Sequence, residues 1–60
     1  MRDRYETKPE ISGWTIYDAA TGLPAILNGL VLSALCFQDA HELVGLLNIL
    51  YFEQVTATIH

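Results

Sequence analysis

The chain has 60 residues, 52% of them hydrophobic, and a formal net charge of −4 at pH 7. Every lysine and arginine lies within residues 1–8, which carry a net charge of +1, so residues 9–60 carry −5. Because a body without cations cannot neutralise phosphates, the composition argues against binding to nucleic acid or to acidic lipids.

The short length limits the core that this chain can build. A domain of this size buries only about 60% of its unfolded surface, and such domains are usually reinforced by disulfides, a metal or self-association. Cys36 is the only cysteine, which excludes a disulfide within the chain. No apolar run approaches the length of a membrane span, and the first ten residues lack the apolar region of a signal peptide. We therefore expect an acidic protein in the reducing cytoplasm, with no membrane partner.

The folded part is predicted to begin after a charged start. Residues 1–12 alternate charges and are predicted to form a flexible N-terminal arm, followed by a single domain over residues 13–54. The segment from Trp14 to Asp18 consists of residues that favour β-strands. Its alternation places Trp14 and Ile16 on one face and Thr15 and Tyr17 on the other.

The sharpest local signal is Asn28-Gly29 between two aliphatic runs. Both central residues of a type I′ turn need positive φ, which this pair tolerates well. The turn fixes the register of a hairpin, with Leu27 opposite Leu30 and Ile26 opposite Val31. Both faces of the hairpin are apolar, whereas an open antiparallel sheet usually turns a polar face to water. A second element is therefore expected to cover the face that carries Ile26, Val31 and Leu35.

A helix is predicted from about Phe37 to Phe52, with Cys36 or Phe37 as its N-cap. At about 100° per residue, one apolar stripe forms along the helix. It contains Ala40, Leu43, Val44, Leu47, Leu50 and Tyr51. Leu46, Ile49 and Phe52 fall outside the stripe and give the helix a second apolar side. Residues 55–60 are left open, as an extension of the helix, a tail or a short edge strand.

The sequence gives little indication of catalysis or metal binding. Asp39, His41 and Glu42 gather near the start of the helix, but a zinc site needs three or four ligands in spacings that are missing here. Cys36 and His41 are about 140° apart around a helix, which argues against a nucleophile–base pair. We therefore expect no catalytic residue, no cofactor and no metal ligand.

Four short motifs resemble those of a set of short uncharacterised bacterial proteins. They are Trp14-Thr15-Ile16-Tyr17-Asp18, Thr21-Gly22-Leu23-Pro24-Ala25, Asn28-Gly29 and Asp39-Ala40. This resemblance implies an architecture for residues 14–50 and no site. A weaker resemblance is to HicB-type antitoxins, in which three strands lead into a helix that begins with an acidic residue and Ala. The chain departs from that pattern because no Pro-Gly-Cys-like segment precedes its helix.

Together these patterns predict an α+β domain, a three-stranded antiparallel β-meander followed by one α-helix packed on a sheet face. We expect a symmetric homodimer, which is the commonest assembly among soluble homo-oligomers. The candidate interface residues are Ile26, Val31, Leu35, Leu46, Ile49 and Phe52. The functional hypothesis is a small non-catalytic protein-interaction module that self-associates. The alternative is an antitoxin-like regulatory protein that binds a basic partner protein.

Overall fold

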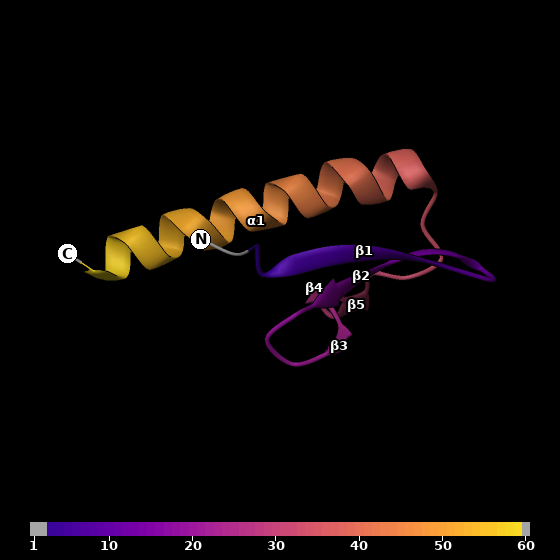
Figure 1. The fold of residues 1–60 in the computed structure, drawn as a ribbon, viewed down its shortest axis with the longest axis horizontal. Coiled ribbons are helices and arrows are strands. Elements are labelled where there is room, and N and C mark those ends of the chain that lie inside the picture. Colours follow the sequence, from indigo (N-terminus) through magenta and orange to yellow (C-terminus); the bar gives the residue numbers. More distant parts are fainter. Residues whose placement is uncertain (1–2, 60) are drawn as a thin grey trace.

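The computed structural model describes residues 3–59, with side chains as far as residue 55. Its elements in chain order are β1 (Tyr5–Glu10), β2 (Gly13–Asp18), β3 (Leu23–Pro24), β4 (Ile26–Leu27), β5 (Leu30–Val31) and α1 (Phe37–Ile59). The fold is α+β, as predicted: a three-stranded antiparallel sheet in the order β1-β2-β3 is followed by one helix. Strands β4 and β5 form a separate two-stranded sheet. Helix α1 runs along one side of the β1–β2 hairpin (Figure 1).

The prediction of a flexible arm over residues 1–12 is wrong for residues 5–10, which form β1; residues 1–2 lie outside the described part of the chain. β1 pairs along its whole length with β2, from Tyr5 opposite Asp18 to Glu10 opposite Gly13. The charged residues of β1 alternate with Tyr5 and Thr7, so the charges share the outer face of the sheet. There the Lys8 ammonium lies 5.1 Å from the centre of the Tyr17 ring. The first strand of the meander is therefore polar, and the strand predicted as first is the central one.

The two faces predicted for β2 are confirmed. Ile16 is completely buried and forms the core with Ala25 and Leu32, against which half-buried side chains of the helix pack. Trp14 lies on the same face, and its ring meets that of Phe37 edge to face at 5.0 Å. On the other face, the Tyr17 hydroxyl donates to the Glu10 carboxylate at 2.9 Å. The core is thus one thin layer between the sheet and α1.

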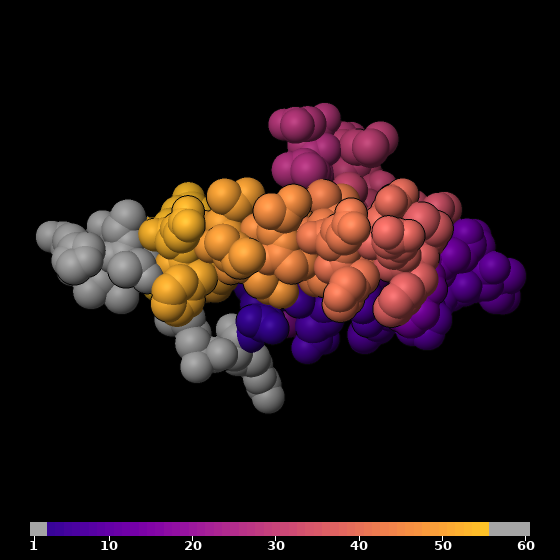
Figure 2. Space-filling model, turned by 90° about the horizontal axis from the view of Figure 1, so that it is seen from above, coloured from indigo at the N-terminus to yellow at the C-terminus, as the bar shows by residue number. Residues whose placement is uncertain are grey.

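The hairpin at Asn28-Gly29 is also confirmed. Asn28 and Gly29 have φ values of 52° and 77°, and Ile26 pairs with Val31 and Leu27 with Leu30. Hydrogen bonds hold the root of the hairpin against β2: the Ile16 N–H donates to the Leu32 carbonyl, and the Ala25 N–H to the Ile16 carbonyl. Seen from above, the hairpin projects beyond one side of α1 (Figure 2).

A short link joins the hairpin to the helix. Trp14 and Leu35 exchange both backbone hydrogen bonds, at 2.8 and 3.0 Å. Cys36 then begins α1 as its N-cap, because its carbonyl accepts from the Ala40 N–H and its thiol from the Asp39 N–H. The helix continues past its predicted end at Phe52 to Ile59, so the strand alternative for the tail is wrong; His60 lies outside the described residues.

Candidate interaction surface

The helix buries a slightly different stripe from the predicted one. Ala40 is fully buried, and Leu43, Val44, Leu47 and Tyr51 are half-buried, as the pattern indicated. Leu50, however, is 59% exposed, and the polar Asn48 is half-buried instead. The stripe is therefore rotated toward β1.

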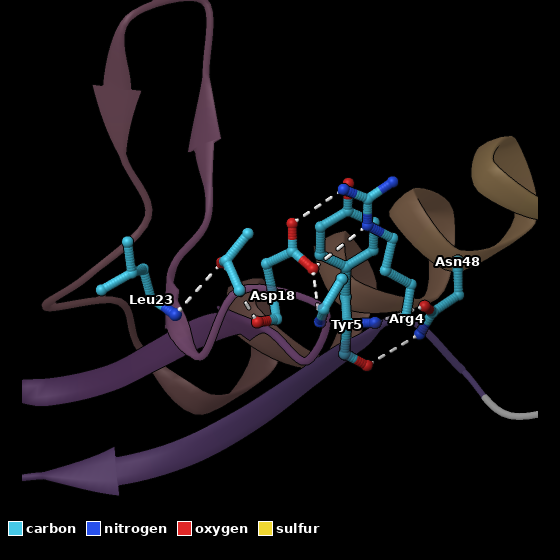
Figure 3. Close-up of polar contacts among 7 residues, drawn as sticks. Arg4, Tyr5, Asp18, Leu23 and Asn48 are labelled. Atoms are coloured by element: carbon cyan, nitrogen blue, oxygen red, sulfur yellow. Dashed lines mark hydrogen bonds and ion pairs between the residues drawn. The ribbon is translucent and has the colours of Figure 1, made fainter.

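Asn48 explains this rotation, because its carboxamide binds the backbone of β1 (Figure 3). Its Oδ1 accepts from the Tyr5 N–H at 2.8 Å, and its Nδ2 donates to the Tyr5 carbonyl at 3.0 Å. Two hydrogen bonds to one residue hold the helix beside the edge strand at a fixed rotation. The sequence offered one signal for this role, a single amide within the aliphatic run from Leu46 to Leu50.

A second polar contact anchors the start of β1 (Figure 3). The Arg4 guanidinium donates to both carboxylate oxygens of Asp18, at 3.1 and 3.0 Å, and lies 5.0 Å from the centre of the Tyr51 ring. The Ala20 N–H also donates to Asp18, at 2.9 Å. Hydrogen bonds from Arg4, and next from Ala20, lower the pKa of Asp18, and the Asp18 contact raises the pKa of Arg4. Because these donors already occupy the carboxylate, Asp18 serves as a structural anchor and is poorly suited to act as a general base.

The outer face of the sheet holds one more perturbed pair. Hydrogen bonding by the Thr15 and Tyr17 hydroxyls lowers the pKa of Glu10, and the contact with Glu10 raises the pKa of Tyr17. Both shifts favour the carboxylate form of Glu10 and the neutral phenol, so the pair is a stable cross-strand contact at neutral pH.

The predicted interface residues are exposed with one exception. Ile26, Val31, Leu46, Ile49 and Phe52 are between 49% and 67% exposed. Leu35 is half-buried and packs against the core, so its side chain is part of the interior. The remaining five residues lie on two elements, the hairpin and the helix.

The structure adds exposed apolar residues that the sequence pattern had not placed on the surface. On the hairpin, Leu27 and Leu30 join Ile26 and Val31 in a hairpin patch, defined by these four residues. On the helix, Leu50 joins Leu46 and Ile49 in a helix patch, defined by these three. The sequence pattern indicated that both faces of the hairpin are apolar, but it gave no sign that the hairpin projects beyond α1 (Figure 2).

Two surface hollows flank these patches. One, of about 390 Å³, lies at the root of the hairpin and is lined by residues that include Arg4, Asp18, Leu23 and Ile26. The other, of about 420 Å³, is lined by Asp3, Asn48, Ile49, Phe52 and Glu53. Each combines apolar side chains with a few charged ones. Each hollow includes one residue of the patches defined above, Ile26 of the hairpin patch in the first and Ile49 of the helix patch in the second.

The residues considered for chemistry are engaged in local contacts. The Cys36 thiol accepts the Asp39 N–H at 3.5 Å, and the His41 ring stacks on Phe37 with ring centres 5.7 Å apart. Within the described part of the chain, no three side chains of His, Cys, Asp or Glu are grouped closely enough to hold a metal ion. Among the described residues, the exposed apolar patches are therefore the feature that the proposed function has to explain.

Comparisons with protein-family models, with curated proteins and with solved structures find no match to this chain. The resemblances to short bacterial proteins and to HicB-type antitoxins stay predictions. Among the described residues, no helix has both the length and the apolar character needed to cross a membrane.

Proposed function

We propose that this chain is a small non-catalytic protein-interaction module that works as a homodimer. The observation that carries the proposal is that the chain exposes more solvent-accessible surface than a compact protein of its mass. A compact protein of 6.7 kDa is expected to expose about 3,900 Å², and this chain exposes 4593 Å². The excess of about 700 Å² is close to the share of about 800 Å² that one partner contributes to a standard interface.

The shape and the distribution of apolar residues support the same proposal. The radius of gyration is 11.8 Å, against about 10.4 Å for a compact domain of this length. Eleven large apolar side chains of the described residues are exposed, whereas Ile16 and Leu32 are the large ones that are buried. So small a core gives little free energy to offset the conformational entropy lost when the chain folds. A second copy would bury further apolar surface and so add the free energy that one copy lacks.

Sedimentation equilibrium at micromolar concentration tests the proposal. We expect a mass of twice the 6.7 kDa of the chain, with cooperative unfolding whose midpoint rises with protein concentration. A monomeric mass together with a stable, concentration-independent fold would overturn it.

A second candidate, an antitoxin-like protein that binds a basic partner, is favoured by the charge of the helix. Asp39, Glu42 and Glu53 are exposed on α1, which contains no lysine or arginine. Salt distinguishes the two candidates. Screening weakens attraction between an acidic helix and a basic partner, but it relieves repulsion between two copies of an acidic chain. Tighter self-association at higher NaCl concentration supports a homodimer held by apolar contacts, whereas a chain that stays monomeric at every NaCl concentration favours the second candidate.

A further inference from the structure

We infer that the two copies meet reciprocally: the hairpin of each copy packs Leu27 and Leu30 against Leu46 and Leu50 on the helix of the other. This inference rests on the homodimer proposed above and specifies its contact surface. Four residues, Leu27, Leu30, Leu46 and Leu50, define what we call the apolar corner.

The first step is the side of α1 on which Leu46 and Leu50 lie. Asn48 faces β1, because it binds the Tyr5 backbone. At about 100° per residue, Leu46 and Leu50 are each about 160° around the helix from Asn48, on the opposite flank. β1 is one edge of the sheet, and the hairpin root is bonded to the other side of β2. Figure 2 shows the hairpin and β1 on opposite sides of α1. Because Leu46 and Leu50 are turned away from β1, they lie on the side of α1 that faces the hairpin.

The second step is the orientation of the hairpin. Side chains alternate along a strand, so Leu27 and Leu30 share a face with Ala25 and Leu32. Ala25 and Leu32 are buried in the core beneath the helix. The face with Leu27 and Leu30 is thus a continuation of the core surface outward past the helix. The apolar corner has the flank of α1 as one wall and this face of the hairpin as the other.

The third step is the occupant. Leu30 is 68% exposed and Leu50 59%, so within one copy neither wall covers the other. The hairpin is an apolar projection beyond α1 (Figure 2), and the corner joins its exposed leucines to those of the helix flank. The surface is therefore complementary to itself, as a two-fold interface requires. In such an interface the hairpin of each copy contacts the helix of the other, so every contact occurs twice. The chain as a whole exposes about 700 Å² more than a compact protein of its mass, which is of the order of one copy's share of a standard interface.

Charge restricts how the helices are arranged. Glu42 and Glu53 are exposed at either end of the helix patch, and no cation follows Lys8. Parallel and antiparallel alignment of two α1 helices would both bring these carboxylates together. A contact centred on Leu46 and Leu50, with the hairpin of the partner between the helices, leaves them at the solvated rim.

Single substitutions test the corner. Leu30→Asp and Leu50→Asp should each raise the dimer dissociation constant at least tenfold, because each would bury a charge in the apolar contact. The matched control is Ile11→Asp, at the β1–β2 turn, where Ile11 is fully exposed and remote from the corner. It should leave the dissociation constant unchanged. Circular dichroism of each variant verifies that the helix is retained.

A complementation experiment tests the reciprocal geometry. Leu30→Lys and Leu50→Asp should each dimerise poorly alone, but a mixture should form a heterodimer. In the heterodimer, Lys at position 30 of one chain meets Asp at position 50 of the other. The second contact, between the unchanged Leu50 and Leu30, is the same as in the native dimer. Failure of the mixture, with a dimeric native chain, overturns the corner and leaves the homodimer standing. A monomeric native chain overturns both.

A measurement on the native sequence covers the case in which these variants do not fold. Isotope-filtered NOE spectra of mixed labelled and unlabelled chains should show contacts between Leu30 methyls of one copy and Leu50 methyls of the other. Intermolecular contacts confined to other residues would overturn the inference.

Discussion

The side chain of Asn48 binds both backbone groups of Tyr5, 43 residues away in the sequence, as a neighbouring strand would. Its carboxamide offers the same donor and acceptor as a peptide group. The contact ties the edge strand to the helix and fixes which side of α1 faces the sheet. It therefore also decides that Leu46 and Leu50 face outward beside the hairpin.

Replacing this amide should be costly. Asn48→Ala removes the Oδ1 and Nδ2 atoms that bind the Tyr5 backbone, so the Tyr5 N–H and carbonyl lose these hydrogen bonds. We expect the free energy of unfolding to fall by about 1–3 kcal/mol. Urea unfolding at a fixed chain concentration measures the loss. Gln38→Ala, at an exposed position in the first turn of the same helix, is the matched control and should change the stability by less than about 0.5 kcal/mol. Equal effects of the two substitutions would show that the Asn48 contact contributes nothing.

Acid should weaken the fold through Asp18. Its pKa is lowered in the folded chain, chiefly by Arg4. A group with a lowered folded pKa contributes its full stability above its unfolded value, about 3.9, and loses it as the pH falls through the folded value. We expect the free energy of unfolding to decline below about pH 4, with about 1 kcal/mol of that decline coming from this pair. Asp18→Asn should flatten the acid limb of the stability profile, and Arg4→Met should do the same. An unchanged profile in both variants would contradict this assignment.

The parts of the fold that depend on local chemistry could be predicted from the sequence. Asn28-Gly29 specifies its own turn and therefore the register of the hairpin, because both residues need positive φ. The start of the helix at Phe37 was predicted from local signals that left Cys36 or Phe37 as its N-cap, and most of its buried stripe follows from periodicity.

The parts of the fold that depend on contacts between residues distant in the sequence could not be predicted. β1 has strand-like alternation, but its charges and Pro9 are equally typical of a disordered segment, and pairing with β2 decides the outcome. Likewise, Leu50 lies at the margin of the apolar stripe, and the contact between Asn48 and Tyr5 turns it outward. Of the six candidate interface residues, five are exposed and Leu35 is half-buried, and the sequence pattern did not indicate that Leu27, Leu30 and Leu50 are exposed as well.

Gly13 should tolerate no side chain. Its φ is +133°, and a Cβ there would lie 2.9 Å from the Leu35 carbonyl oxygen and 3.0 Å from the Ala34 carbonyl carbon. These are backbone atoms of the segment bonded to Trp14, so they cannot move without breaking that pairing. Gly13→Ala should lower the stability by at least about 2 kcal/mol. Gly45→Ala is the matched control: it lies in the exposed helix with open space around its Cβ position, and should gain about 0.5–1 kcal/mol. Thermal unfolding followed at 222 nm compares the two, and a stable Gly13→Ala chain would contradict the close approach.

The N-cap offers a substitution that should strengthen the fold. Sulfur is a weak hydrogen-bond acceptor, and the Cys36 thiol lies 3.5 Å from the Asp39 nitrogen. Serine is among the preferred N-cap residues, and its hydroxyl can accept the same N–H at a shorter distance. Cys36→Ser should therefore raise the unfolding free energy by about 0.5–1 kcal/mol, whereas Cys36→Ala removes the acceptor and should not. Urea midpoints of the two variants, taken at one chain concentration, make the comparison. Equal midpoints for Ser and Ala would mean that the side chain at position 36 does not cap the helix, and that the Trp14–Phe37 ring contact and the Trp14–Leu35 pairing fix where α1 begins.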